Sequence, residues 1–133
     1  MKKYLLDTSI CVFLFRNKYN VAKRLDEVGI DNCFISDVTL AELTYGAYKS
    51  ERVEENLKLI AELAEDIGIV SFNESIDVYA KEKNRLRENG TPIEDFDLLI
   101  ASAAISRGYT LITDNVKHFD RVHGLLYENW IER

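Results

Sequence analysis

Residues 3–11, KYLLDTSIC, decide the fold that we expect for this chain. The apolar run at residues 3–6 has the length and composition of a short buried strand, and Asp7 stands where that strand ends. The sequence becomes apolar again after Thr8 and Ser9, where a helix over residues 9–15 is predicted. A carboxylate at the end of a buried strand needs an explanation, because an unpaired charge is costly to bury.

Strands and helices alternate along the rest of the chain. Apolar runs predict further buried strands at residues 33–36, 67–72, 109–113 and 124–128. Helical periodicity predicts helices at residues 20–28, 38–49, 52–66, 74–88 and 94–108. We therefore expect a single α/β domain over residues 1–133, with three layers (α/β/α) and a central, mainly parallel sheet of four to five strands.

Local patterns make these expectations more specific. Asn20 is expected to cap the helix at 20–28, and Ser36 or Asp37 the helix at 38–49. On the helix at 38–49 we expect the face with helical spacing to be the packed one, which consists of Val38, Ala41, Tyr45 and Tyr48.

The composition is that of an ordinary globular protein. The chain has 133 residues, of which 47% are apolar and 30% charged, as expected for one domain. Its longest apolar run, ICVFLF, is far shorter than the roughly 20 residues that cross a bilayer, so we expect a cytoplasmic protein without a membrane segment. Cys11 and Cys33 are expected to be reduced, buried thiols. The net charge of −6 argues only mildly against nucleic acid as a partner, because an acidic cleft can lie beside a basic rim.

Four acidic residues are candidates for a binding site, and two of them lie outside the carboxyl ends of strands, where open parallel sheets form their sites. Asp7 and Asp114 directly follow predicted strands, Glu42 lies in an apolar helix, and Asp97 lies in the first turn of another. Carboxylates that converge repel one another unless a cation neutralises them, and oxygen ligands suit Mg²⁺ or Mn²⁺. The residues alone therefore predict a metal site.

Each acid also has a purely structural interpretation. Asp7 could cap the helix that follows it, and Asp95 or Asp97 could cap the helix at 94–108, which we expect for one of the two. Glu42 could pair with a lysine, and Asp114 could be a turn residue.

Five motifs resemble those of PIN-domain proteins, and in particular the VapC toxins of bacterial VapBC toxin–antitoxin pairs. They are YLLDTSIC, SDVTLAELTYGAYKS, GTPIEDFDLLIASAAISRG, LITDNVKHFDRVHGL and YENW, in the family's order and over nearly the whole chain. The resemblance implies a PIN-like fold and an endoribonuclease that depends on Mg²⁺ or Mn²⁺. It implies that Asp7, Glu42 and Asp97 are the catalytic and metal-binding acids, with Asp97 preferred over Asp95.

The sequence departs from the family at a fourth acidic position. Many PIN domains have Thr-x-Asp there, whereas this chain has Thr113, Asp114 and Asn115. Asp114 or Asp120 could substitute, and the resemblance leaves open whether the protein holds one metal ion or two.

The resemblance also implies partners and a mechanism. We expect water to attack an RNA phosphodiester and leave a 5′-phosphate, with Glu42 orienting or deprotonating that water. A tRNA is the substrate that we expect first, because some family members cut initiator tRNA. A cognate VapB-like antitoxin, a homodimer and a higher toxin–antitoxin complex are the expected assemblies. The alternative is a PIN-like RNA- or protein-binding module without catalysis, which the amide at Asn115 favours.

Other polar groups are expected to play lesser roles. His118 and His123 lack the spacing of metal ligands and are expected at the surface. One basic group is expected to pair with neighbouring acids on a solvated helix, and consists of Lys81, Lys83, Arg85 and Arg87. A second basic group is expected near the acidic site, where it would position the phosphates of a nucleic acid. It consists of Arg16, Lys18, Lys23 and Arg24.

Overall fold

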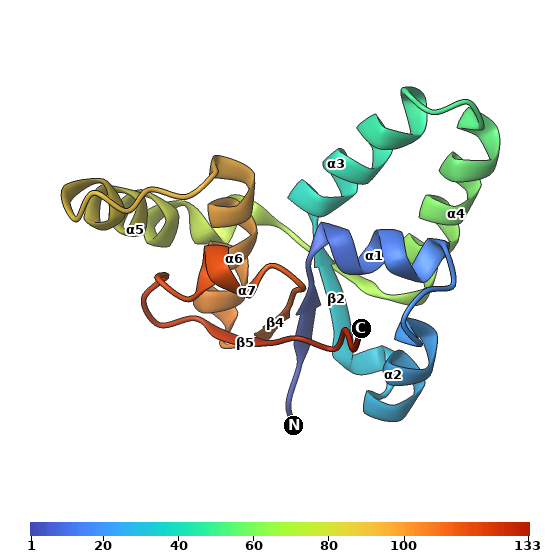
Figure 1. The fold of residues 1–133 in the computed structure, drawn as a ribbon, viewed down its shortest axis with the longest axis horizontal. Helices are drawn as coiled ribbons and strands as arrows, with labels where there is room; N and C mark the ends of the chain where they lie inside the picture. The colour runs from blue at the N-terminus through green and yellow to red at the C-terminus, as the bar shows by residue number, and fades with distance from the viewer.

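A sheet of five parallel strands separates two layers of helices in the computed structural model, which describes residues 1–133 (Figure 1). The strand order is β3-β2-β1-β4-β5, and every neighbouring pair is parallel. The strands are β1 (Tyr4–Leu6), β2 (Cys33–Ser36), β3 (Gly68–Val70), β4 (Thr110–Ile112) and β5 (Leu126–Glu128). The predicted three-layer α/β architecture is confirmed.

The helices divide by their place in the chain. Figure 1 shows the first four on one side of the sheet, namely α1 (Thr8–Phe15), α2 (Val21–Val28), α3 (Asp37–Tyr48) and α4 (Val53–Asp66). The other side carries α5 (Ile76–Glu88), α6 (Asp95–Arg107) and α7 (Val116–Phe119). Two short 3₁₀ turns, η1 (Ile30–Asn32) and η2 (Phe72–Ser75), and α7 were not predicted from the sequence.

The centre of the sheet is where the chain changes direction. β1 pairs with β2 on one side and with β4 on the other, in a register that puts Leu6 beside Ile112. The order of the strands thus runs outward from β1 through β2 to β3, and then resumes at β4 on the opposite side. Open α/β sheets bind their ligands at the carboxyl ends of the strands at such a switch point.

Alternating side chains along the strands build a core on each face of the sheet. Leu6 and Ile112 point into the cluster beneath α1–α4, whereas Leu5 and Leu111 point into the cluster beneath α6 and α7. All four are completely buried. The central strands β1, β2 and β4 are mostly buried and form apolar runs, which is why the sequence predicted them.

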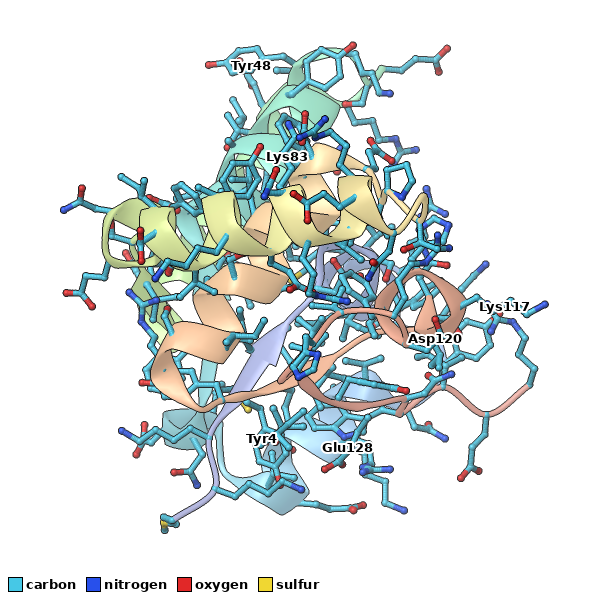
Figure 2. The ribbon with its side chains drawn as sticks, turned by 90° about the vertical axis from the view of Figure 1, so that its left-hand side faces the viewer. Tyr4, Tyr48, Lys83, Lys117, Asp120 and Glu128 are labelled. Atoms are coloured by element: carbon cyan, nitrogen blue, oxygen red, sulfur yellow. The ribbon has the colours of Figure 1, made fainter.

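The packed face of α3 differs from the prediction. Thr39, Leu43 and Ala47 are its buried residues, whereas Tyr45 and Tyr48 are 67% and 64% exposed. Tyr48 lies at the far end of α3 in Figure 2. Two faces of this helix carry apolar residues at helical spacing, so periodicity alone cannot choose between them, and packing against α1 and α4 decides.

The predicted caps are only partly correct. Ser36 caps α3, because its Oγ accepts a backbone N–H in the first turn at 3.0 Å. Asn20 occupies the N-cap position of α2 as predicted, but it adopts a left-handed conformation (φ 57°) and its side chain makes no capping hydrogen bond. The prediction for α6 is wrong, because Glu94 occupies the N-cap position and Asp95 and Asp97 both lie in the first turn.

Two smaller expectations concern cysteines and membranes. Cys11 and Cys33 are free thiols buried in the core, as expected. None of the helices combines the length and the apolar character that spanning a bilayer requires.

Two glycine substitutions test the packing of the sheet. A Cβ added at Gly68 would lie 2.4 Å from Cδ2 of Phe34, whose ring packs 5.0 Å from that of Tyr109. We expect Gly68→Ala to lower the free energy of unfolding by about 1–3 kcal/mol, since the ring must be displaced. In urea unfolding, Gly46→Ala is the matched control. Its Cβ meets nothing within 4 Å, so it should raise stability by up to about 1 kcal/mol through helix propensity. Equal effects of the two changes would contradict the packing described.

Candidate active site

The acidic residues singled out in the sequence meet at the switch point of the sheet. Asp7 directly follows β1, Glu42 lies in the second turn of α3, and Asp97 lies in the first turn of α6. All three line one cavity of about 260 Å³, to which no hydrophobic residue contributes. The other lining residues are Thr8, Ser9, Asp114 and Asn115. Segments distant along the chain therefore form one polar, acidic cavity.

Asp7 is the most deeply buried of these acids, with only 5% of its surface exposed. Its Oδ1 accepts the backbone N–H of Thr8 at 2.8 Å, so Asp7 is also the N-cap of α1. Its Oδ2 accepts the hydroxyl of Thr113 at 2.8 Å, which ties the end of β1 to the end of β4. The structural and the functional interpretations of Asp7 are thus compatible.

The environment of Asp7 opposes its ionisation. Burial raises the pKa of its carboxyl from the ordinary 3.8 to about 6, and the charges of Asp97 and Glu42 add to that increase. The hydrogen bonds from Thr113 and Thr8 act in the opposite direction but do not prevail. The fold therefore holds a carboxylate whose charge it does not compensate.

Glu42 is half-buried beside α1. Its Oε1 accepts the hydroxyl of Thr8 at 2.7 Å, and Oγ1 of Thr8 lies 3.2 Å from Oγ1 of Thr39. Burial raises the pKa of Glu42, with further contributions from Asp97 and Glu94. No lysine pairs with Glu42, so the structural interpretation that assigned it to a surface ion pair is not what the structure shows.

Asp97 has a histidine partner that sequence reasoning missed. Nδ1 of His118, on α7, lies 3.1 Å from Oδ2 of Asp97 and 2.7 Å from the amide nitrogen of Asn115. With a proton on Nδ1 the imidazole donates to Asp97, and the Asn115 amide then turns its oxygen toward the ring. His118 was expected as a surface residue, and no spacing in the sequence indicates its contact with Asp97. His123 contributes only its backbone N–H, which Glu82 accepts.

Asp95, the nearest alternative to Asp97, points elsewhere. It is exposed and bonds to Lys83 at 2.8 Å and to the hydroxyl of Tyr79 at 3.0 Å. Asp97 is the residue of the two that lines the cavity.

Asp114 and Asp120, the two residues that could substitute for the family's fourth acid, have different surroundings from the other three acids. Asp114 lines the cavity, but both of its oxygens bond to the guanidinium of Arg133, at 2.6 Å each. Arg133 holds the pKa of Asp114 below its usual range. Asp120 is exposed directly after α7 (Figure 2) and is not one of the residues that line the cavity.

The three acids Asp7, Glu42 and Asp97 have no lysine or arginine partner. Although they line one cavity, no three His, Cys, Asp or Glu side chains lie close enough together in the structure to surround one ion.

Of the two expectations for basic side chains, the structure bears out the one for the group on α5. The group on α5 is solvated and paired with neighbouring acids, as Lys83 in Figure 2 illustrates. Its ion pairs are Lys81–Asp77, Lys83–Asp95 and Arg85–Glu82. In the second group, Arg24 packs over the ring of Trp130 at 5.0 Å and Lys23 pairs with Glu27 at 3.9 Å, while Arg16 lines a groove next to the acids.

That groove lies between α1, α3 and α4. It has a volume of about 410 Å³ and is partly apolar, with Val12, Phe15 and Leu43 among its lining residues. It shares Thr8 and Glu42 with the acidic cavity. An elongated surface therefore runs from an apolar groove to the acids.

Comparison with known proteins agrees with this geometry. Residues 4–125 match the PIN domain family. The chain is 36% identical over 131 residues to the tRNA(fMet)-specific endonuclease VapC of Shigella flexneri, covering 98% of this chain and 99% of the relative. It is 37% identical over 130 residues to the ribonuclease VapC1 of Haemophilus influenzae strain R2866, covering 96% and 97% of the two chains.

Solved structures show the same fold. The DNA-bound VapBC of Salmonella typhimurium superimposes with a TM-score of 0.92 at 32% identity, over 98% of this chain and 99% of the other. VapBC2 of Rickettsia felis, bound to a promoter DNA fragment, gives a TM-score of 0.89 at 35% identity, over 96% and 98%. The chain therefore belongs to the PIN domain family and, within it, to the VapC ribonucleases.

Proposed function

We propose that this protein is the toxin of a toxin–antitoxin pair and acts as a Mg²⁺-dependent endoribonuclease, with a tRNA as its substrate. The observation that carries the proposal is the convergence of Asp7, Glu42 and Asp97 on one polar cavity without a lysine or arginine partner. The names of the relatives, which are ribonucleases and a tRNA-specific endonuclease, support the reaction class and the substrate.

The residues that line the cavity fit a hard divalent cation. Their donors are oxygens, which Mg²⁺ prefers and Mn²⁺ accepts. Ser9, another lining residue, has a buried hydroxyl oxygen without a hydrogen-bond partner. The raised pKa of Asp7 reports repulsion and desolvation that a cation would relieve.

Asp7 and Asp97 would hold the ion, with Glu42 binding it directly or through water. When bound, Mg²⁺ would polarise the scissile phosphate and make an attacking water more acidic. Glu42 is suited to orient or deprotonate that water, because burial raises its pKa and Thr8 fixes one of its oxygens. Thr113 holds the second oxygen of Asp7, and His118 holds Asp97. Attack by water leaves a 5′-phosphate and does not require the ribose 2′-hydroxyl.

The groove between α1, α3 and α4 supports the proposal of an antitoxin partner. Because it opens onto the acidic cavity through Thr8 and Glu42, a peptide that lies in it reaches the catalytic acids. We propose that a VapB-like antitoxin binds there, that the toxin forms a homodimer and a higher complex with it, and that the pair acts in the cytoplasm.

Substitution of the acids tests the nuclease. We expect Asp7→Asn and Asp97→Asn each to lower RNA cleavage by about 100-fold or more, because each removes a charge that the metal requires. The measurement is sequencing of RNA 5′ ends after brief expression, with 5′-phosphate ends and tRNA fragments expected for the parent.

Asp95→Asn is the matched control for Asp97→Asn, because it makes the same chemical change two residues away on the exposed side of α6. It should cleave like the parent. If it lost as much activity as Asp97→Asn, the site assignment would be wrong. A parent protein that binds its antitoxin but produces no new RNA ends would instead identify a non-catalytic module.

The pH dependence of stability tests the burial of Asp7. A carboxyl whose pKa rises from 3.8 to about 6 on folding destabilises the native state as pH increases through that interval. With chelator present, Asp7→Asn should therefore stabilise the protein by about 1–3 kcal/mol at pH 7.5, and by much less near pH 4. Urea unfolding at the two pH values measures the difference. A pH-independent effect of the substitution would show that the charge of Asp7 is not the cause.

A further inference from the structure

Arg133 makes the closest contact with an acid of the cavity. Its Nη1 and Nη2 donate to Oδ1 and Oδ2 of Asp114, each at 2.6 Å, in the two-pronged geometry that gives strong arginine–carboxylate pairs. Asp114 retains only 16% side-chain exposure, whereas Arg133 is 57% exposed. The basic side chain thus approaches Asp114 from solvent, and Asp114 in turn lines the cavity.

The guanidinium is also held from a second direction. It lies 5.3 Å from the ring centroid of Tyr19, in the connection between α1 and α2. The Tyr19 ring in turn packs edge-on against Phe13, with 4.9 Å between centroids. Arg133 is therefore fixed between an anionic and an aromatic partner.

We infer that Arg133 withdraws Asp114 from metal binding, so that the cavity takes a single divalent cation. This inference rests on the proposed metal site, and it concerns the fourth acid that the sequence left undecided. Asp114 is the one cavity carboxylate that carries its own arginine countercharge, while Asp7, Glu42 and Asp97 do not.

The charges explain why the Arg133–Asp114 ion pair, called the clamp below, controls the number of bound cations. Two divalent cations carry four positive charges, and Asp7, Glu42 and Asp97 together offer three negative ones. With Arg133 in place, Asp114 adds no net charge to the cavity, and each of its oxygens already accepts a short hydrogen bond. Loss of Arg133 frees a fourth carboxylate at the rim of the same cavity, which would attract a second cation or bind the first more tightly.

Mn²⁺ titration of the full chain tests the inference, with the number of bound ions counted by electron paramagnetic resonance and calorimetry. The parent should bind one Mn²⁺, and Arg133→Gln should bind a second ion or bind the first about tenfold more tightly. Asp114→Asn should bind no second ion and should bind the first no more tightly than the parent, because the guanidinium of Arg133 then lacks its countercharge. The double variant Arg133→Gln with Asp114→Asn should lose the gain.

Two variants separate the clamp from general charge effects and from misfolding. Lys117→Gln removes the same charge from the exposed side of α7, where Lys117 points into solvent (Figure 2), and should leave Mn²⁺ binding unchanged. Arg133→Lys keeps the charge and should retain the parental number of ions. Thermal unfolding establishes that each variant is folded.

Each failure has a different meaning. Unchanged Mn²⁺ binding in folded Arg133→Gln, or a gain that persists in the double variant, would overturn the role of the clamp. Two ions in the parent, reduced to one by Asp114→Asn, would overturn it as well but leave metal dependence intact. A parent that binds no Mn²⁺ would overturn the proposed metal site itself.

Discussion

The buried charge of Asp7 is the constraint on which the rest of the structure depends. The residue sits at the end of the central strand, almost completely enclosed, with two other uncompensated carboxylates facing the same cavity. Two hydrogen bonds, from Thr8 and Thr113, are what the fold offers it, and they do not offset the loss of hydration. A fold rarely retains such a group without a functional reason, because replacing it by a neutral residue of the same shape would be more stable. A cation bound in the proposed site would offset this uncompensated charge.

The topology of the sheet explains how three distant residues come to share this cavity. Because the chain leaves β1 toward β2 and returns later to β4 on the other side, the carboxyl end of β1 has α3 on one flank and α6 on the other. Glu42 and Asp97 lie in the early turns of those helices, which keeps their backbones close to the sheet edge. The contact from Thr113 to Asp7 couples the ends of β1 and β4 directly. Rigid elements, rather than flexible loops, thus position all three acids.

The sequence predicted those features that depend on local patterns. The central strands were predictable because they are mostly buried, and Asp7 was recognisable because a carboxylate interrupts an apolar run. The packed face of α3 was mispredicted, since both candidate faces are apolar at the same spacing and only the neighbouring helices distinguish them. His118 and Arg133 were missed for a related reason. Each contacts its acid across a sequence separation, 21 residues for His118 and 19 for Arg133, that no short motif reveals.

The acids of the cavity differ in how their charge is compensated, and that difference assigns them different roles. Asp114 has a full ionic partner in Arg133, and Oδ2 of Asp97 lies 3.1 Å from the imidazole of His118. Asp7 and Glu42 have hydroxyl and amide donors alone. No lysine or arginine offsets the charge of Asp7, Glu42 or Asp97, so the negative potential of the cavity comes from these three acids rather than from Asp114. A cation and an attacking water drawn to that potential would lie next to the one glutamate that is oriented and raised in pKa, which is where a general base is required.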